Sequence, residues 1–213
     1  MRFHEELWAS LPERLALPDL SARRAFLRAH VTTTHPPPRV LDLGCGTGWA
    51  TAEAVRAGAE AVGADVAEAA LERARAAHPE LAFERVPDDG PLPFGDGSFD
   101  LVWASEVIAH VLDLATWLSE VRRVLRSGGR LALTTPYHGR VQLALAALGG
   151  AERSFDPLGP EIRFLTPRSL SGLLGDLGFA PVRVRAVGGP PLLRRSVHAS
   201  AERAAWRVAG GGR

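Results

Sequence analysis

The stretch Arg39–Trp49, RVLDLGCGTGW, decides the fold. It joins a short apolar segment to glycines at alternate positions, Gly44, Gly46 and Gly48, and a helical pattern follows. Glycine is needed where a backbone turns sharply, takes a positive φ or is approached closely by a ligand. A strand, a glycine turn and a helix in this order predict the first βα unit of an open α/β sheet, with a ligand crevice at the carboxyl end of the strand.

The details of this turn argue against two common phosphate-binding motifs. A dinucleotide-binding fingerprint has a glycine at its sixth position, where this chain has Trp49. A mononucleotide-binding loop needs a closing lysine, and all 25 basic residues of this chain are arginines. The turn is therefore poorly suited to a pyrophosphate or a triphosphate.

Length and composition indicate one globular α/β domain. The chain has 213 residues, 46% of them hydrophobic and 23% charged, with a formal net charge of +1. Nucleic-acid binding is not expected, because it needs a strongly basic face. The single cysteine, Cys45, excludes an internal disulfide and fits a reducing compartment. The first residues lack a signal-peptide core and no segment is long and apolar enough to span a membrane, so a cytoplasmic protein is expected.

Two amphipathic helices are expected within residues 1–38, before the glycine turn. Apolar side chains recur there at helical spacing, and two prolines interrupt the pattern. This extension is either an outer layer covering the sheet or a lid over the crevice, with Trp8 or Phe3 facing the substrate. Aromatic residues at helical spacing more often belong to a core, which favours the outer layer. Residues 39–213 are expected to form the ligand-binding domain.

The rest of the chain alternates strand and helix patterns, as a mostly parallel sheet requires. Residues 196–201 alternate like a strand, but the residues that follow them fit a helix equally well. Strands are expected at 60–65, 81–86, 99–103, 131–135 and 179–187, and helices at 49–57, 66–78 and 114–125 and from Pro167 onward.

Asp65 ends the second expected strand, 21 positions after Gly44. In α/β nucleotide sites an acidic residue about 20 positions after the first glycine accepts hydrogen bonds from the ribose hydroxyls. Asp is also a favoured N-cap, so Asp65 could instead cap the following helix. Its position relative to the glycine turn favours the ribose role.

Three stretches together resemble a known family. Residues 40–48, VLDLGCGTG, resemble the first motif of the class I S-adenosylmethionine-dependent methyltransferases. Residues 91–111, PLPFGDGSFDLVWASEVIAHV, resemble the small-molecule subgroup that includes the quinone-biosynthesis methyltransferases, methyltransferase type 11. Residues 120–136, EVRRVLRSGGRLALTTP, resemble the helix and fifth strand of that subgroup.

The resemblance implies a Rossmann-like fold and a reaction. The sheet would have seven mostly parallel strands with an antiparallel last strand, and helices on both faces. The cofactor would be S-adenosyl-L-methionine, the product S-adenosyl-L-homocysteine and the acceptor a small molecule, with no metal. An insertion at about 137–163 would lie over the substrate mouth. Candidates for contacting the acceptor there are Tyr137, His138, Arg140, Arg153 and Arg163.

Cofactor contacts also follow from the resemblance, residue by residue. Gly44 and Gly46 would admit the amino-carboxylate of the cofactor, and Asp42 would bind near its amino group. Asp65 would hold the ribose, and Asp88 with the backbone of Asp89 would hold the adenine. The family usually has a small residue at position 89, so either carboxylate of this pair could face adenine, or the pair could form a solvated turn. The expected cofactor-binding residues are Asp42, Gly44, Cys45, Gly46, Asp65, Val66, Asp88, Asp89 and Ser105.

His110 is the candidate catalytic residue. The family has a histidine at this position beside the reactive methyl group, and often a second one where this chain has Ala109. His110 would serve as a base toward the acceptor, line the pocket without proton transfer, or be structural. Glu106 is four residues away and would share its face in a helical turn. A metal site is not favoured, because these two residues lack the HExxH spacing and Cys45 stands alone.

Three functions remain open. The leading one is a small-molecule methyltransferase, and the second is a protein that binds the cofactor without catalysis, as a sensor or a degenerate enzyme. The third, an NAD-dependent enzyme, is disfavoured by Trp49. The sequence indicates no particular acceptor or oligomeric state.

Overall fold

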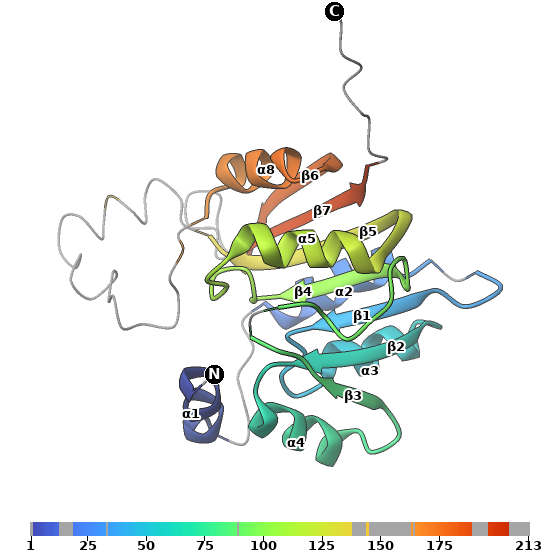
Figure 1. Cartoon of the computed structure of the whole chain (residues 1–213), viewed down its shortest axis with the longest axis vertical. Coiled ribbons are helices and arrows are strands. Elements are labelled where there is room, and N and C mark those ends of the chain that lie inside the picture. The colour runs from blue at the N-terminus through green and yellow to red at the C-terminus, as the bar shows by residue number, and fades with distance from the viewer. Residues whose placement is uncertain are drawn as a thin grey trace, which may run out of the picture.

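The computed structural model describes residues 2–12, 19–32, 34–88, 90–137, 144, 163, 165–188 and 196–204. A seven-stranded sheet of order β3-β2-β1-β4-β5-β7-β6 forms its centre (Figure 1). β1 to β5 pair in parallel, and β7 runs antiparallel to both of its neighbours. The strands are β1 Arg39–Leu43, β2 Glu60–Asp65, β3 Ala82–Arg85, β4 Phe99–Ser105, β5 Leu125–Pro136, β6 Phe179–Val187 and β7 Ser196–Arg203.

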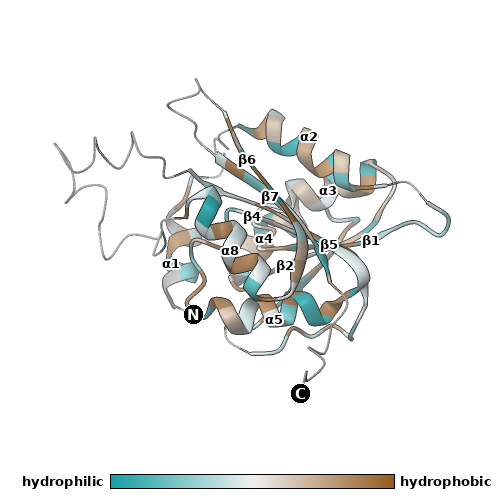
Figure 2. Cartoon of the chain, turned by 90° about the horizontal axis from the view of Figure 1, so that it is seen from above, coloured by the Kyte–Doolittle hydropathy of each residue, from teal (hydrophilic) through white to brown (hydrophobic). Residues whose placement is uncertain are grey.

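Helices cover both faces of this sheet. Seen from above, α2 and α3 lie on one side and α5 and α8 on the other (Figure 2). The helices are α1 Arg2–Ser10, α2 Leu20–His30, α3 Trp49–Arg56, α4 Glu68–Ala77, α5 Leu114–Val124 and α8 Pro167–Asp176. The predicted fold class is confirmed, including the antiparallel last strand that the sequence left open to a helix.

The two faces follow from alternation along the central strands. Val40 and Trp103 join the apolar cluster under α2 and α3, whereas Leu41 and Val102 join the cluster under α5 and α8. Successive side chains of a strand point to opposite faces of a sheet, so strands covered on both sides must be apolar at nearly every position. Apolar side chains on both faces of β1 and β4 therefore bury the centre of the sheet.

The order of strands sets the place of a ligand site. β1 has β2 on one side and β4 on the other. From β1 the chain adds β2 and β3 toward one edge of the sheet, and then continues with β4 and β5 toward the opposite edge. In open α/β sheets, ligands bind at such a switch point, outside the carboxyl ends of the strands. Those ends carry the glycine turn after β1, Asp65 at the end of β2 and Ser105 at the end of β4.

β5 begins earlier than the sequence suggested. The sequence predicted a strand at 131–135, whereas the strand runs over Leu125–Pro136. Its pairing with β4 shifts register between Phe99 and Leu101, so part of β5 bulges from the ladder. Gly128 there has φ +74°, which glycine adopts without strain. The residues before the predicted strand thus form an irregular first part of a longer strand.

The segment after β4 is also not the helix that would place Glu106 and His110 on one face. β4 continues to Ser105, and 108–110 form a single turn in which His110 N donates to Val107 O at 2.9 Å. Glu106 has φ +61°, a left-handed conformation that is rare for residues other than glycine. The left-handed backbone of Glu106, and not a helix, therefore sets the direction of its side chain.

Helix ends match their sequence signals. α8 begins at Pro167, as expected, with Thr166 as its N-cap, and Asp113 accepts from two backbone N–H groups at the start of α5. No helix in the described part of the chain is both long enough and apolar enough to cross a lipid bilayer.

Candidate cofactor and active site

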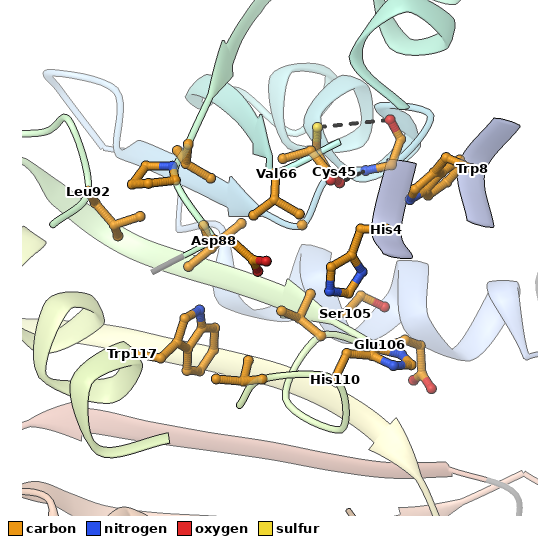
Figure 3. A pocket seen from close by; sticks show the side chains of 18 of the residues that line it. His4, Trp8, Cys45, Val66, Asp88, Leu92, Ser105, Glu106, His110 and Trp117 are labelled. Atoms are coloured by element: carbon orange, nitrogen blue, oxygen red, sulfur yellow. Dashed lines mark hydrogen bonds between the residues drawn. The ribbon is translucent and has the colours of Figure 1, made fainter. Parts of the chain in front are cut away.

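A cavity of about 540 Å³ lies at the carboxyl ends of β1, β2 and β4 (Figure 3). This volume is in the range of pockets that hold small molecules. Side chains reach it from α1, the glycine turn, the loop after β3, the segment after β4 and the start of α5. The cavity therefore occupies the switch point that the topology defines.

The glycine turn is held against β2 and is packed closely from outside. Gly44 N and Cys45 N both donate to Ala64 O, at 2.7 and 3.0 Å. A Cβ on Gly44 would lie 2.3 Å from Val107 Cγ2, and one on Gly46 would lie 2.8 Å from Trp8 Cη2. Both glycines also have positive φ, +77° and +53°. The sequence suggested that a ligand comes close to these glycines. In the structure, the side chains of Val107 and Trp8 occupy much of that space.

Asp65 braces this turn from the end of β2. It is 5% exposed and lines the cavity, and its two carboxylate oxygens accept from Gly46 N at 2.9 Å and Ala67 N at 3.1 Å. Burial raises its pKa, while these hydrogen bonds and nearby His4 lower it. The N-cap of α4 is Ala67, so Asp65 is not the N-cap residue. Each carboxylate oxygen can still accept a further bond, so the ribose role stays a prediction with a suitable acceptor in place.

Asp42 does not line the cavity. Its carboxyl group is buried behind the turn, 2% exposed, and accepts from Thr51 Oγ1 at 2.7 Å. Burial, with a smaller contribution from the charge of Asp65, raises the pKa of Asp42 to about 7. The structure therefore gives no direct contact surface for the amino-group role expected of this residue.

The end of the cavity away from α1 is mostly apolar. Asp88 lines it beside Leu92 and Trp117 (Figure 3), and Val66 lines it from the end of β2. Asp89, its partner in the expected adenine contact, lies outside the described residues. Asp88 is thus brought to this end, where Glu120 of α5 also lines the cavity and accepts from Leu92 N at 2.8 Å.

Cys45 also lines the cavity, but its thiol is expected to be unreactive. The residue is buried, and burial together with the charges of Asp42 and Asp65 raises the pKa of its thiol. A thiol kept protonated is a poor nucleophile. Cys45 therefore contributes shape rather than reactivity.

The centre of the cavity holds a polar network after β4. Ser105 Oγ lies 2.9 Å from Thr134 Oγ1, which donates to Glu106 Oε1 at 2.7 Å. Arg23 of α2, 5% exposed, places Nη2 3.2 Å from the same glutamate oxygen. His110 lies beside Glu106, and both line the cavity (Figure 3). The network fixes the Glu106 carboxylate, and the His110 imidazole lies next to it in the cavity.

Arg23, His4 and Trp117 were not expected as lining residues. Arg23 comes from α2, His4 from α1 and Trp117 from α5, and only the packing of these helices brings them to the cavity. An arginine inside an amphipathic helix carries no signal that its side chain will be buried. Trp8, considered as a possible lid residue, does line the cavity; the side chain of Phe3 lies outside the described part.

Two of the acceptor candidates in the expected insertion, Tyr137 and Arg163, are described by the structure, and neither lines the cavity. Tyr137 packs against the apolar cluster under α5 and α8 and does not line the cavity. Arg163 donates from Nε to Val111 O at 3.0 Å and also bonds to Leu112 O, so it holds a cavity-lining segment in place. His138, Arg140 and Arg153 lie outside the described residues.

No metal site is evident in the described ranges. They contain no group of three or more His, Cys, Asp and Glu side chains close enough to hold an ion. The expectation of a metal-free reaction stays a prediction.

Comparison with known proteins agrees with the sheet order and the cavity. Residues 41–133 match the model of the methyltransferase domain family. The ubiquinone biosynthesis O-methyltransferase of Ruegeria sp. (strain TM1040) is 32% identical over 162 residues, covering 73% of this chain and 65% of that one. The demethylmenaquinone methyltransferase of Beutenbergia cavernae is 40% identical over 111 residues, covering 52% of this chain and 45% of that one.

A solved structure of a relative extends the likeness over the fold. The S-adenosylmethionine-dependent methyltransferase from Mesorhizobium loti has a TM-score of 0.65 and 25% identity, covering 87% of this chain and 99% of that one. In its sheet order, its cavity and its sequence matches, the chain is similar to the class I S-adenosylmethionine-dependent methyltransferases. The likeness to the methyltransferase domain family known as type 11 lies in residues 41–133, somewhat less than half of the chain. The chain spans between 19% and 65% of the length of the curated relatives it matches first.

The raised pKa of Asp42 predicts a pH-dependent stability. An unfolded Asp has a pKa of about 3.9, so the folded protein holds this proton more tightly between about pH 4 and 7. The fold therefore loses stability as pH rises through that window, and the loss persists above it. Asp42→Asn keeps the shape and cannot ionise. From pH 4.5 to 8, the free energy of unfolding of this variant should rise relative to that of the wild type by about 3 kcal/mol, measured by urea denaturation.

Asp176→Asn is the matched control, because the Asp176 side chain is exposed at the end of α8. Its stability should follow the wild-type pH curve. Parallel curves for Asp42→Asn and the wild type would contradict the assignment of a buried, weakly acidic Asp42.

Proposed function

We propose that the protein transfers a methyl group from S-adenosyl-L-methionine to a small-molecule acceptor by in-line displacement. The observation that carries this proposal is the carboxylate of Asp65, which faces a cavity of about 540 Å³ and braces a lysine-free glycine turn at the switch point of the sheet. The family match over 41–133 covers these same elements and supports the choice of cofactor.

The lining suits this cofactor better than a phosphate-bearing one. Among the described lining residues the one arginine, Arg23, is paired with Glu106, so it offers little to a pyrophosphate. Asp65 and Asp88 instead give the cavity an acidic character, which favours a ligand with positively charged sulfur and amino groups. Asp65 would hold the ribose and Asp88 the adenine, with Val66 packed between them.

The bound cofactor would supply a methyl group already activated by positive sulfur, with a neutral leaving group that needs no acid. The protein then has to orient the acceptor and exclude water. Apolar side chains such as Leu7, Val107 and Trp117 line the cavity and can do the second. Orientation of the acceptor falls to the polar network of Arg23, Glu106 and His110.

His110 is the group we propose for proton handling. An acceptor hydroxyl becomes a better nucleophile when a base near neutral pKa takes its proton, and an imidazole is suited to that role. A carbanion or amine acceptor would ask less of it. The fixed carboxylate of Glu106 beside His110 favours catalysis over mere cofactor sensing, because a sensor has no need of a base at this place.

The names of the relatives and the net charge of the chain suggest which acceptors to test first. The two relatives compared above carry names from quinone biosynthesis, which supports testing phenols and quinols first. A net charge of +1 supports a small acceptor over a nucleic acid. The substrate-side insertion at 137–163 and a cytoplasmic location remain part of this proposal.

Cofactor choice and catalysis can be tested in two assays. S-adenosylhomocysteine should raise the melting temperature of the protein and NADH should not, because bound ligand stabilises the folded state. With a panel of phenols, quinols and amines, at least one acceptor should release S-adenosylhomocysteine in a single turnover. Stabilisation without release from any acceptor would favour a cofactor sensor, and stabilisation by NADH alone would contradict the proposal.

Asp65→Ala should lower the affinity for S-adenosylhomocysteine at least about tenfold in isothermal titration calorimetry. The variant removes the expected ribose acceptor and the brace of Gly46 N together, and hydrogen bonds to a charged group are worth about 1.5–3 kcal/mol each. Asp96→Ala, on the surface, should bind as the wild type does. Undiminished binding by Asp65→Ala would reject the ribose role.

His110→Ala should slow turnover by about 10²-fold or more with a hydroxyl acceptor while the affinity for S-adenosylhomocysteine stays within about twofold. Loss of a base affects the chemical step, and His110 is not assigned to the cofactor. Single-turnover rates and calorimetry on the same preparation separate the two effects. An equal loss of binding and rate would indicate a structural histidine instead.

A further inference from the structure

α1 lies beyond the carboxyl ends of the strands, beside α4 (Figure 1), and forms one wall of the cavity. His4, Leu7 and Trp8 of α1, and Leu11 just after it, all line the cavity. The contacts that hold α1 in this place are mainly polar, and both ends of the helix are held by α4.

The first contact is a helix cap supplied from a distance. α4 begins with Ala67 at its N-cap, a residue whose side chain cannot accept a hydrogen bond. The carboxylate of Glu5 fills that need, accepting from Glu68 N at 2.9 Å and from Ala69 N at 3.0 Å. The first N–H groups of a helix have no partner within the helix and carry partial positive charge, so a carboxylate binds there well. Glu5 thus ties α1 to the start of α4.

The second contact closes the other end of α1. Arg73 of α4 donates from Nη2 to Leu11 O at 2.8 Å and from Nη1 to Pro12 O at 3.2 Å. Its guanidinium also lies 5.9 Å from the centre of the Trp8 ring, within the range of a cation–π contact. Arg73 therefore holds the chain where it leaves α1, and steadies the aromatic side chain of the same helix.

Two side chains of α1 reach the residues expected to bind the cofactor. Trp8 packs on Gly46, where a Cβ would lie only 2.8 Å from the indole. His4 points into the cavity (Figure 3), near enough to Asp65 for its charge to lower the pKa of that carboxyl. α1 thus covers the glycine turn and the ribose acid at once.

Little apolar surface holds α1 down. None of its described side chains, 4–10, is fully buried, whereas α2, α4, α5 and α8 each have buried residues. Segments with few buried apolar contacts open locally at low free-energy cost. Hydrogen bonds such as those of Glu5 and Arg73 can be exchanged for bonds to water when the helix lifts.

We propose that α1 is a lid over the cofactor half of the cavity and that Glu5 and Arg73 form its latch. The lid covers the glycine turn with Trp8, and the cofactor enters and leaves when the latch opens. This inference rests on the proposed cofactor, but its signature is the rate of exchange rather than the methyl transfer.

The test compares Glu5→Ala with Glu6→Ala in the full chain. Glu6 is exposed on the same helix, so it is a control of matched chemistry. Stopped-flow tryptophan fluorescence with S-adenosylhomocysteine should show both association and dissociation rate constants raised about fivefold or more in Glu5→Ala, and unchanged within about twofold in Glu6→Ala. Arg73→Ala should act as Glu5→Ala does.

The two rate constants separate a lid from a damaged site. A gate that opens more often speeds entry and exit together, whereas loss of the α4 cap that merely distorts the site would speed dissociation alone. Hydrogen exchange of the ligand-free protein gives a second readout: amides of 2–12 should exchange faster in Glu5→Ala, with those of β4 unchanged.

Unchanged rate constants in Glu5→Ala, or a rise in dissociation alone, would overturn the lid while leaving the proposed function intact. Failure of the wild-type protein to bind S-adenosylhomocysteine at all would overturn the proposed function and, with it, the lid as a cover for this cofactor.

Discussion

The buried carboxylate of Asp65 connects the parts of this site. Its two oxygens accept from Gly46 N and Ala67 N, so one side chain fixes the glycine turn after β1 and the approach to α4 after β2. A carboxylate with 5% exposure is costly to bury unless its oxygens are bonded, and these backbone groups reduce that cost. The same geometry leaves the carboxylate facing the cavity, ready for a ligand with paired hydroxyl groups.

The sheet makes this interaction possible. Parallel strands buried on both faces place their carboxyl ends at one edge, where β1 and β2 bring the glycine turn and Asp65 side by side. Beyond that edge, α1 lines the cavity and is tied to α4 by polar contacts, and Glu106, Arg23 and Thr134 form a polar network at the centre of the cavity. Glu106 holds a left-handed backbone there, the kind of local strain that tends to mark functional positions.

Local sequence signals predicted the framework well, because each depends on residues close together in the chain. The glycine turn, the alternation of central strands and the Thr166–Pro167 start of α8 are of this kind, and so is the place of Asp65. Signals that depend on packing between distant segments were missed. Asp42 lies behind the turn with Thr51, Tyr137 packs into the core, and Glu5 caps a helix that begins 63 residues later in the sequence.

Local patterns leave these placements open for a common physical reason. An Asp next to a glycine turn, a Tyr after a strand or a Glu in an amphipathic helix has the same local pattern whether it faces a ligand or another part of the protein. Only tertiary contacts decide, as the indole of Trp8 over Gly46 illustrates. The roles of Asp88 and His110 rest on their place in the cavity together with the family match.

A crystal structure of the protein grown with S-adenosylhomocysteine tests the central claim most directly. The account predicts the nucleoside in this cavity, with both ribose hydroxyls within hydrogen-bond distance of the Asp65 carboxylate and the sulfur directed toward Glu106 and His110. A nucleoside bound elsewhere, or a ribose turned away from Asp65 in this cavity, would contradict it.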